Sequence, residues 1–222
     1  MTILKKRLFL PLGRMGTQPE RMREVMLDRL NIEGVSAKRA ILPPETEKFC
    51  DRIGSRAENL FLTHQYYCSE SVLLSLNHAL GGGLSEEQAV GMAAPYSMAM
   101  GESGCACGAL NGGILAIGLF TGMRGAFRLR RLSRRLAREF HDQFKAEFGS
   151  ACCRILTRKV KSDPRAHRLH CARMTAWTAA AAARLLVAQY PELDQKGDMT
   201  YLDKRESRFS ALLRNIQRWI RA

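Results

Sequence analysis

The pattern of apolar and polar positions along the chain predicts a series of helices. Apolar side chains recur at spacings of three and four, the period of an amphipathic helix, over residues 45–62, 68–80, 125–148, 165–190 and 201–221. No segment shows the sustained alternation of apolar and polar residues that is typical of a half-buried strand. We therefore expect an all-α fold, a compact multi-helix bundle.

Turn and capping residues predict where several of these helices begin and end. A glycine triplet at 81–83 should stop the helix that precedes it. Ser85, followed three residues later by Gln88, is a capping box and predicts a short helix that runs to about Met92. The polar segment 194–199 is expected to be a loop between the last two helices.

The stretch from Cys105 to Met123 contains no charged residue. Its length would suit a membrane span, but its first third is small and weakly hydrophobic, and aromatic belts are absent. We predict instead a buried, glycine-rich central helix, with a membrane span as the alternative. Glycines at 104, 108 and 112 repeat every four residues and would leave one helix face free of side chains. A second helix or a cofactor could approach the backbone closely along that face.

Composition divides the chain into three parts. Residues 1–44 are polar and basic, with a loose helical pattern over 18–30, and end in a Pro-Pro pair that is typical of a linker. Residues 45–195 carry most of the apolar helical pattern and are expected to form the main domain. Residues 196–222 are expected to add a C-terminal amphipathic helix.

The net charge of +14 favours an anionic partner, such as nucleic acid, an anionic membrane surface or an acidic protein. The main basic cluster is an arginine face on the helix predicted to end near Phe148. It comprises Arg124, Arg128, Arg130, Arg131, Arg134, Arg135 and Arg138. A solvated helix face is the simpler interpretation. No base-reading aromatic set accompanies the arginines, so nucleic acid is not favoured, while contact with a membrane surface stays open.

Seven cysteines occur in the chain, and no secretory signal is recognisable before them. We therefore expect a cytoplasmic protein, and in that compartment a cysteine cluster is more often metal-binding or redox-active than a set of structural disulfides. Cys50 lies on a predicted helix face with Phe49 and Ile53, and we interpret it as a small buried hydrophobe.

Several of the other cysteines stand at predicted helix starts, where they could converge at one end of a bundle. They are Cys68, Cys107, Cys152 and Cys153, and Cys171 lies early in the long helix. Backbone N–H groups at a helix N-terminus favour a thiolate, so Cys107 is expected to have a lowered pKa. No Cys-x-x-Cys pair is present, which argues against a zinc finger.

The cysteines lie in short motifs that occur in a specific order along the chain. The motifs are AENLF at 57–61, YCSESV at 67–72, CGALNG at 107–112, CRIL at 153–156 and finally Cys171. In order and spacing they resemble a family of redox-active proteins named for a C, GCAxxG, C, C signature, over roughly residues 55–190. The resemblance implies four site cysteines and a glycine motif. The cysteines are Cys68, Cys107, Cys153 and Cys171, and the motif is completed by Gly108, Ala109 and Gly112 as candidate cofactor-binding residues.

This chain departs from the family pattern by carrying two further cysteines, Cys105 and Cys152, each close to a family cysteine. Either could substitute for its neighbour or act as a resolving thiol. The basic segment before residue 45 and the last predicted helix lie outside the resemblance.

Three hypotheses about function follow. In the first, the chain is a thiol–disulfide exchange or electron-transfer protein, with Cys107 as the low-pKa thiol and an unidentified redox partner protein. Its electrostatic helpers would be Arg154, Lys159 or His170, and either His167 or His170 could enter the site.

In the second hypothesis the same four thiolates hold an iron–sulfur cluster or zinc. In the third the chain is a non-enzymatic helical module whose arginine helix docks on an acidic partner. Whether the chain is an oxidoreductase, and whether it forms a homo-oligomer, stays open at this point.

Overall fold

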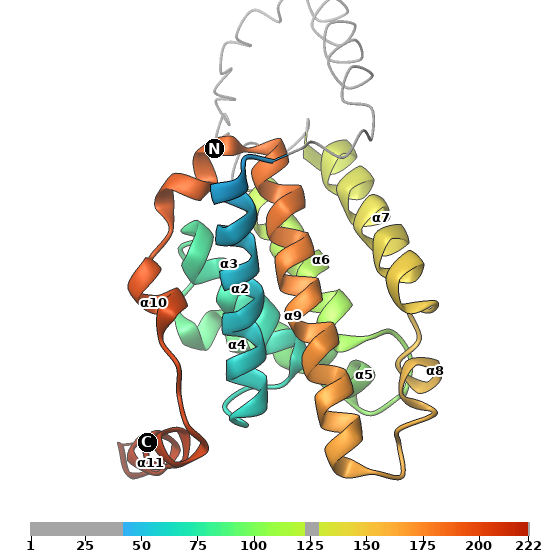
Figure 1. Cartoon of the computed structure of the whole chain (residues 1–222), viewed down its shortest axis with the longest axis vertical. Coiled ribbons are helices and arrows are strands. Elements are labelled where there is room, and N and C mark those ends of the chain that lie inside the picture. The colour runs from blue at the N-terminus through green and yellow to red at the C-terminus, as the bar shows by residue number, and fades with distance from the viewer. Residues whose placement is uncertain (1–41, 123–128, 222) are drawn as a thin grey trace, which may run out of the picture. The chain divides into compact units, whose positions relative to one another are not determined.

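A computed structural model of the chain describes residues 42–122 and 129–221, most of which are helical (Figure 1). No strand occurs in those two ranges, so the all-α prediction is confirmed for them. The helix predicted over 18–30 and the start of the one predicted over 125–148 lie outside the described residues. Residues 41–222 form one compact unit, within which the helices are described below.

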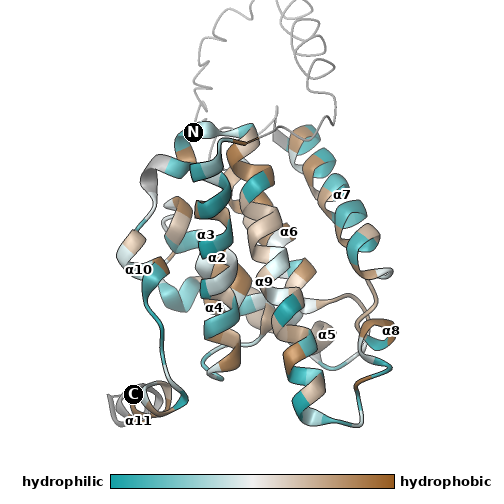
Figure 2. Cartoon of the chain, in the orientation of Figure 1, coloured by the Kyte–Doolittle hydropathy of each residue, from teal (hydrophilic) through white to brown (hydrophobic). Residues whose placement is uncertain are grey.

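Four helices pack against one another at the centre of this unit: α2 (Pro44–Leu62), α3 (Cys68–Leu80), α6 (Gly108–Gly122) and α9 (Pro164–Gln189). A fifth, α7 (Leu129–Phe148), lies against α6 and α9. Figure 2 shows hydrophobic and hydrophilic residues alternating along α7, as expected for an amphipathic surface helix. The apolar faces meet in a core that includes Ile53, Leu60, Leu73, Leu76, Ile117, Phe140, Phe144 and Leu186.

The predicted capping residues end and begin helices where the sequence indicated. α3 ends at Gly81, which adopts a left-handed conformation with φ of 69°. The capping box at Ser85 is present: the backbone N–H of Gln88 donates to Ser85 Oγ at 3.2 Å, and the N–H of Ser85 donates to Gln88 Oε1 at 2.9 Å. It opens α4 (Glu86–Ala93).

The uncharged stretch forms the buried central helix α6. A Cβ at Gly112 would lie 2.5 Å from the carbonyl oxygen of Ser69 on α3, and a Cβ at Gly113 would collide with the ring of Phe140 on α7. Glycine is therefore required at both positions for close helix packing. Among the described residues, no helix is long and apolar enough to cross a membrane.

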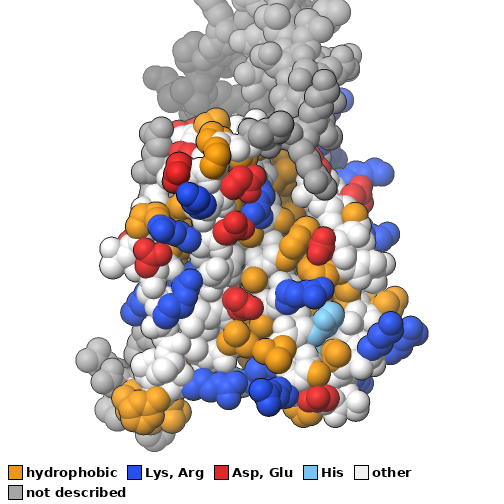
Figure 3. Space-filling view, in the orientation of Figure 1, with side chains coloured by type: hydrophobic (Ala, Val, Ile, Leu, Met, Phe, Trp, Pro, Cys, Tyr) orange, Lys and Arg blue, Asp and Glu red, His pale blue; other side chains and the backbone are white. Residues whose placement is uncertain are grey.

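Two predictions near the C-terminus are wrong. The segment expected as a loop over 194–199 begins instead within a 3₁₀ helix, η2 (Pro191–Lys196). The helix predicted over 201–221 is two helices, α10 (Met199–Asp203) and α11 (Arg208–Arg221). Four large apolar residues of α11 are exposed rather than packed on the bundle, and Figure 3 shows hydrophobic side chains on its surface: Phe209, Leu212, Leu213 and Ile216.

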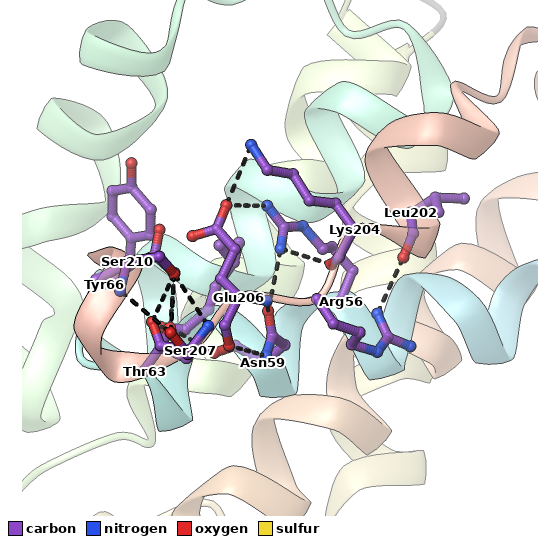
Figure 4. A network of polar contacts seen from close by, with 12 residues as sticks. Arg56, Asn59, Thr63, Tyr66, Leu202, Lys204, Glu206, Ser207 and Ser210 are labelled. Carbon is purple, nitrogen blue, oxygen red and sulfur yellow. Dashed lines mark hydrogen bonds and ion pairs between the residues drawn. The ribbon is translucent and has the colours of Figure 1, made fainter. Parts of the chain in front are cut away.

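The break between α10 and α11 has a visible cause in the polar network of Figure 4. Arg56 on α2 donates to the carbonyl oxygen of Lys204 at 2.9 Å and pairs with the Glu206 carboxylate at 3.4 Å. Asn59 exchanges two hydrogen bonds with the backbone of Glu206, at 3.0 and 3.1 Å. Because α2 binds these backbone groups, they are not available for a continuous helix.

Candidate functional site: the cysteine cavity

A cavity of about 820 Å³ lies where the C-terminal end of α2, the N-terminal ends of α3 and α9, and the short helix α8 (Cys153–Thr157) meet. Three of the cysteines line it: Cys68, Cys153 and Cys171. Cys107 lies behind this wall, with only 3% of its surface exposed, and is not a lining residue. Charge on Cys68 or Cys153 would raise the pKa of Cys107 and also that of Cys171, which places all four thiols in one neighbourhood.

Cys68 is the first residue of α3 and sits among backbone donors. The helix start is held by Glu70, whose carboxylate accepts the backbone N–H of Tyr67 at 2.8 Å. The backbone N–H groups of Met98 and Ser69 favour the Cys68 thiolate and lower its pKa. Burial acts in the opposite direction and is the larger effect, so the Cys68 pKa is raised overall.

The N–H of Met98 is aimed at Cys68 by an unusual backbone segment. It lies in α5 (Ser97–Gly101), where Met98, Ala99 and Met100 have φ of 51°, 63° and 56°. These values are left-handed and cost roughly 1–2 kcal/mol for each residue that is not glycine. The 3₁₀ turn η1 (Ala94–Tyr96) precedes it, and Ser97 and Ser69 are hydrogen-bonded through their hydroxyls at 2.6 Å. Strain of this kind concentrates at functional sites.

The glycine motif of α6 supports Cys68 from behind. A Cβ at Gly108 would collide with Cys68 Sγ and lie 2.9 Å from the carbonyl oxygen of Tyr96. Gly112 faces Ser69, one residue further along α3, while Ala109 is buried in the bundle. The predicted side-chain-free face is thus occupied by a helix, α3. Gly104 is not part of α6: it has a φ of 79° and lies under the guanidinium of Arg154.

Two loops hold Cys107 and Cys153 side by side through backbone hydrogen bonds. The N–H of Cys107 donates to the carbonyl oxygen of Ala151 at 2.8 Å, and the N–H of Arg154 donates to that of Gly104 at 3.2 Å. The Arg154 guanidinium adds a bond of 2.8 Å to the carbonyl oxygen of Ser103. Segments 103–107 and 151–154, distant in sequence, therefore form one wall of the site.

The thiols are less acidic than their helix positions predicted. Burial raises the pKa of Cys107 above its usual value, and the N–H groups of Leu110 and Ala109 only partly offset it. The expected low-pKa thiol at Cys107 is therefore wrong. Burial, with Cys68 and Cys153 nearby, raises the pKa of Cys171 to about 12. Burial and the neighbouring Cys152 raise that of Cys153.

The remaining cysteines lie outside the cavity. Cys105 is exposed, and Cys152 is half-buried with its thiol 3.5 Å from the carbonyl oxygen of Gly104. Cys50 is fully buried, as predicted, and burial raises its pKa to about 12. All seven are free thiols.

The basic residues at the cavity differ in part from those that the sequence suggested. Arg154 lines it as expected, and so does His167, whereas Lys159 and His170 do not. Sequence reasoning missed three lining residues, His64, Lys161 and Arg168. Arg168 could have been found, because it precedes Cys171 by one helical turn. It lies 2.6 Å from Nδ1 of His64, and burial together with the charge of Arg168 lowers the pKa of His64.

Metal binding receives no support from the described residues. In the two described ranges, no group of three or more His, Cys, Asp or Glu side chains is arranged to hold a metal ion.

The fold and the cavity define an all-α protein with a four-cysteine site at one end of a helix bundle. A family model described as "Putative redox-active protein (C_GCAxxG_C_C)" matches residues 66–185, more than half of the chain. The chain belongs to this family. Comparisons with curated proteins and with solved structures gave no match.

Proposed function

We propose that this protein performs thiol–disulfide exchange in the cysteine cavity, with Cys68 and Cys153 as the exchanging pair. The observation that carries the proposal is the position of these two thiols on facing elements of one open cavity, close enough for charge on Cys153 to raise the pKa of Cys68. Membership of a redox-active family supports the same chemistry.

Cys68 is the attacking thiol in this proposal. Its thiolate accepts hydrogen bonds from Met98 and Ser69, and it faces the cavity, whereas Cys107 does not. Cys68 sulfur attacks a substrate disulfide, the substrate S–S bond breaks, and one substrate thiol leaves. Cys153 sulfur then attacks Cys68 sulfur and releases the second substrate thiol. Two protein thiols are oxidised to one disulfide, one substrate disulfide is reduced to two thiols, and the two protons end on the released thiols.

The raised pKa values fit a slow, selective exchanger rather than a fast general reductant. Exchange needs the thiolate, and burial keeps most of each thiol protonated near neutral pH. A substrate that fills the cavity would hold its disulfide next to Cys68 and make use of the small thiolate fraction that is present. Selectivity would therefore come from binding, not from an intrinsically reactive thiol.

Disulfide mapping tests the proposal. Fully reduced protein is treated with one equivalent of bis(2-hydroxyethyl) disulfide, quenched with acid, alkylated and mapped by mass spectrometry. A Cys68–Cys153 bond is expected, with Cys68→Ser abolishing it and Cys50→Ser, a matched change of a buried cysteine outside the cavity, leaving it intact. Two outcomes contradict the proposal. One is that no disulfide forms among the cavity cysteines, and the other is that Cys153 forms a disulfide with another cysteine equally well in Cys68→Ser.

Two further measurements distinguish thiol–disulfide exchange from the metal-binding and docking hypotheses. Anaerobically purified protein should be colourless, because an iron–sulfur cluster would give visible absorption. Reversing Arg131 and Arg134 on α7 should leave exchange unchanged, whereas a docking module would lose its function.

A further inference from the structure

We infer that the cysteine cavity binds a small anionic thiol or disulfide, whose negative charge is received by Arg154, Lys161 and Arg168. The inference rests on the proposed exchange function and adds the chemical class of the substrate. It is carried by the charges of the lining residues and by the lack of carboxylate partners for the cations, both of which come from the described part of the chain.

The three cations stand beside the thiols that they would serve. Arg154 directly follows Cys153 on α8, and Arg168 precedes Cys171 by one turn of α9. Lys161 lies in the segment that joins these two helices. All three line the cavity, so a ligand in contact with the sulfur atoms would meet positive charge on the α8–α9 side.

None of these three cations is ion-paired with a carboxylate within the residues 42–122 and 129–221. Arg154 donates to a backbone carbonyl, which leaves its charge uncompensated, and Arg168 contacts the ring of His64. Lowering of the His64 pKa keeps that imidazole neutral, so it accepts from the guanidinium and adds no repulsion. Cations that face a cavity without a carboxylate partner are available to an anion.

Two carboxylates also line the cavity and must be set against the cations. Glu70 is committed to the α3 start, where it accepts from the N–H of Tyr67 at 2.8 Å and from Ser97 Oγ at 3.4 Å. Glu102 is exposed, on the left-handed turn. Even with both ionised, the lining carries a positive balance, before His167 is counted.

An adjoining pocket extends the positive surface. It shares Pro164 and Arg168 with the cysteine cavity and adds Arg165 and Arg208. Its carboxylate, Glu206, is already paired with Arg56 and Lys204. Figure 3 shows Lys and Arg side chains gathered at this end of the helix bundle, near the bottom of the view. A ligand with two separated carboxylates would find cations in both pockets.

The apolar residues of the lining indicate what the uncharged part of the ligand is like. Phe61, Tyr67 and Met98 line the same cavity, so a carbon or peptide backbone can pack between the cations and the thiols. A cavity of about 820 Å³ has room for a molecule the size of a short peptide. The class that fits is an acidic, low-molecular-weight thiol in its disulfide form, which is reduced in the exchange as Cys68 and Cys153 are oxidised.

Competition between disulfides of different charge tests the inference. Reduced protein is oxidised in separate reactions by glutathione disulfide (anionic), bis(2-hydroxyethyl) disulfide (neutral) and cystamine (cationic). To correct for intrinsic reactivity, the rate for each disulfide is divided by the rate at which the same disulfide reacts with free mercaptoethanol. At low salt the normalised rate for glutathione disulfide should exceed that for cystamine by roughly tenfold or more, and the ratio should shrink in 0.5 M salt. The double variant Lys161→Glu/Arg168→Glu should reverse the preference.

A matched control separates cavity charge from overall charge. The double variant Arg131→Glu/Lys145→Glu changes two exposed cations of α7 and lowers the net charge by the same amount. It should keep the wild-type preference within about twofold, because neither residue lines the cysteine cavity. Equal normalised rates for the three disulfides, or an equal loss of preference in both double variants, would overturn the inference.

A non-reacting ligand keeps this test independent of the exchange reaction. S-Methylglutathione cannot exchange, and at millimolar concentration it should slow the alkylation of Cys153 in the wild type but not in Lys161→Glu/Arg168→Glu. Protection without any exchange would refute the proposed function and support the anion site. Exchange with all three disulfides, without protection and without charge preference, would support the function and refute the anion site.

Discussion

Two groups of basic side chains in this protein have opposite environments. Arg56 is buried, and its guanidinium is 3.4 Å from the Glu206 carboxylate, which Lys204 also reaches at 3.3 Å. Arg154, Lys161 and Arg168 have no such carboxylate partner among the described residues and face an open cavity. The first group has its charge neutralised inside the chain, where it holds α2 to the C-terminal segment. The second is left for something outside the chain to neutralise.

The difference shows how structural charge can be told from functional charge. A buried ion pair is costly to break because one partner is left desolvated and unpaired. An exposed cation contributes little to stability, so its loss should be felt mainly where it meets a ligand. The two groups should therefore respond to mutation in different ways: the Arg56 network mainly through folding, and the cavity cations mainly through reactivity.

Breaking the Arg56 network should have the largest effect on stability. Arg56→Met leaves Glu206, whose side chain is 4% exposed, without its buried partner and frees the carbonyl of Lys204. We expect the free energy of unfolding to fall by about 3–5 kcal/mol in urea denaturation. Lys161→Met, the same substitution at a cavity cation, should cost less than about 0.5 kcal/mol. A similar cost at both positions would remove the distinction.

Filling the glycine face behind Cys68 should have the next largest effect. Gly112→Ala places a methyl group 2.5 Å from the backbone oxygen of Ser69, so α3 must move away from α6. We expect the free energy of unfolding, measured by urea denaturation, to fall by roughly 1–3 kcal/mol. Disulfide exchange at Cys68 should also become slower. Gly118→Ala on the same helix meets nothing within 4 Å and should instead stabilise by up to about 1 kcal/mol. A destabilised Gly118→Ala would show that helix α6 is not packed as described.

Raising the pH should destabilise the folded protein through the cysteines. Burial raises the folded-state pKa of Cys68, Cys153 and Cys171 above the usual thiol value of 9.0. Below pH 8 the thiols are protonated in both states, so their contribution to stability is fully present. As the pH rises above 9, the unfolded chain loses these protons first, and stability falls by up to about 1.4 kcal/mol per pH unit for each thiol.

This pH effect is measured by denaturation at pH 7.5 and 9.5 in the presence of a reductant. Cys171→Ser should lessen the drop, while replacing exposed Cys105 with Ser should not. Stability that is constant over this range would show that the cavity thiols are well solvated.

Removing a single cavity cation should give the smallest change in stability. Arg154→Ala, Lys161→Ala and Arg168→Ala should each unfold within about 0.5 kcal/mol of the wild type, with unchanged circular dichroism. Their effect should appear in the rate of reaction with anionic disulfides. A cation that proves to be worth more than about 1 kcal/mol to folding belongs with the Arg56 group.

Much of the helical architecture followed from the sequence, because caps and periodicity are local. The bounds of α3 and the Ser85 capping box depend on residues within a few positions of each other, and both predictions are confirmed. The break before α11 could not be predicted, because it depends on Arg56 and Asn59, nearly 150 residues away. Periodicity alone made 201–221 a single helix.

The candidate site was predictable in part for the same reason. Helix starts put Cys68, Cys107 and Cys153 near one end of the bundle, and family motifs singled out the same residues. The sequence could not show that Cys107 is buried behind Cys68, and burial is what reverses its expected pKa. Nor could it show that Lys161 and His64, from two separate segments, share the cavity.

In the left-handed turn at 98–102, side chains can be replaced without removing the group that contacts Cys68. Its N–H at Met98 serves Cys68 through the backbone, while the side chains of Met98 and Met100 are 48% and 46% exposed. β-Branched side chains resist the positive φ of this turn, so replacements there need a Cβ without a branch. Met98→Trp would place a fluorophore in the lining of the cavity and keep a backbone N–H at this position, and its emission is expected to report on oxidation of the thiols that share the cavity.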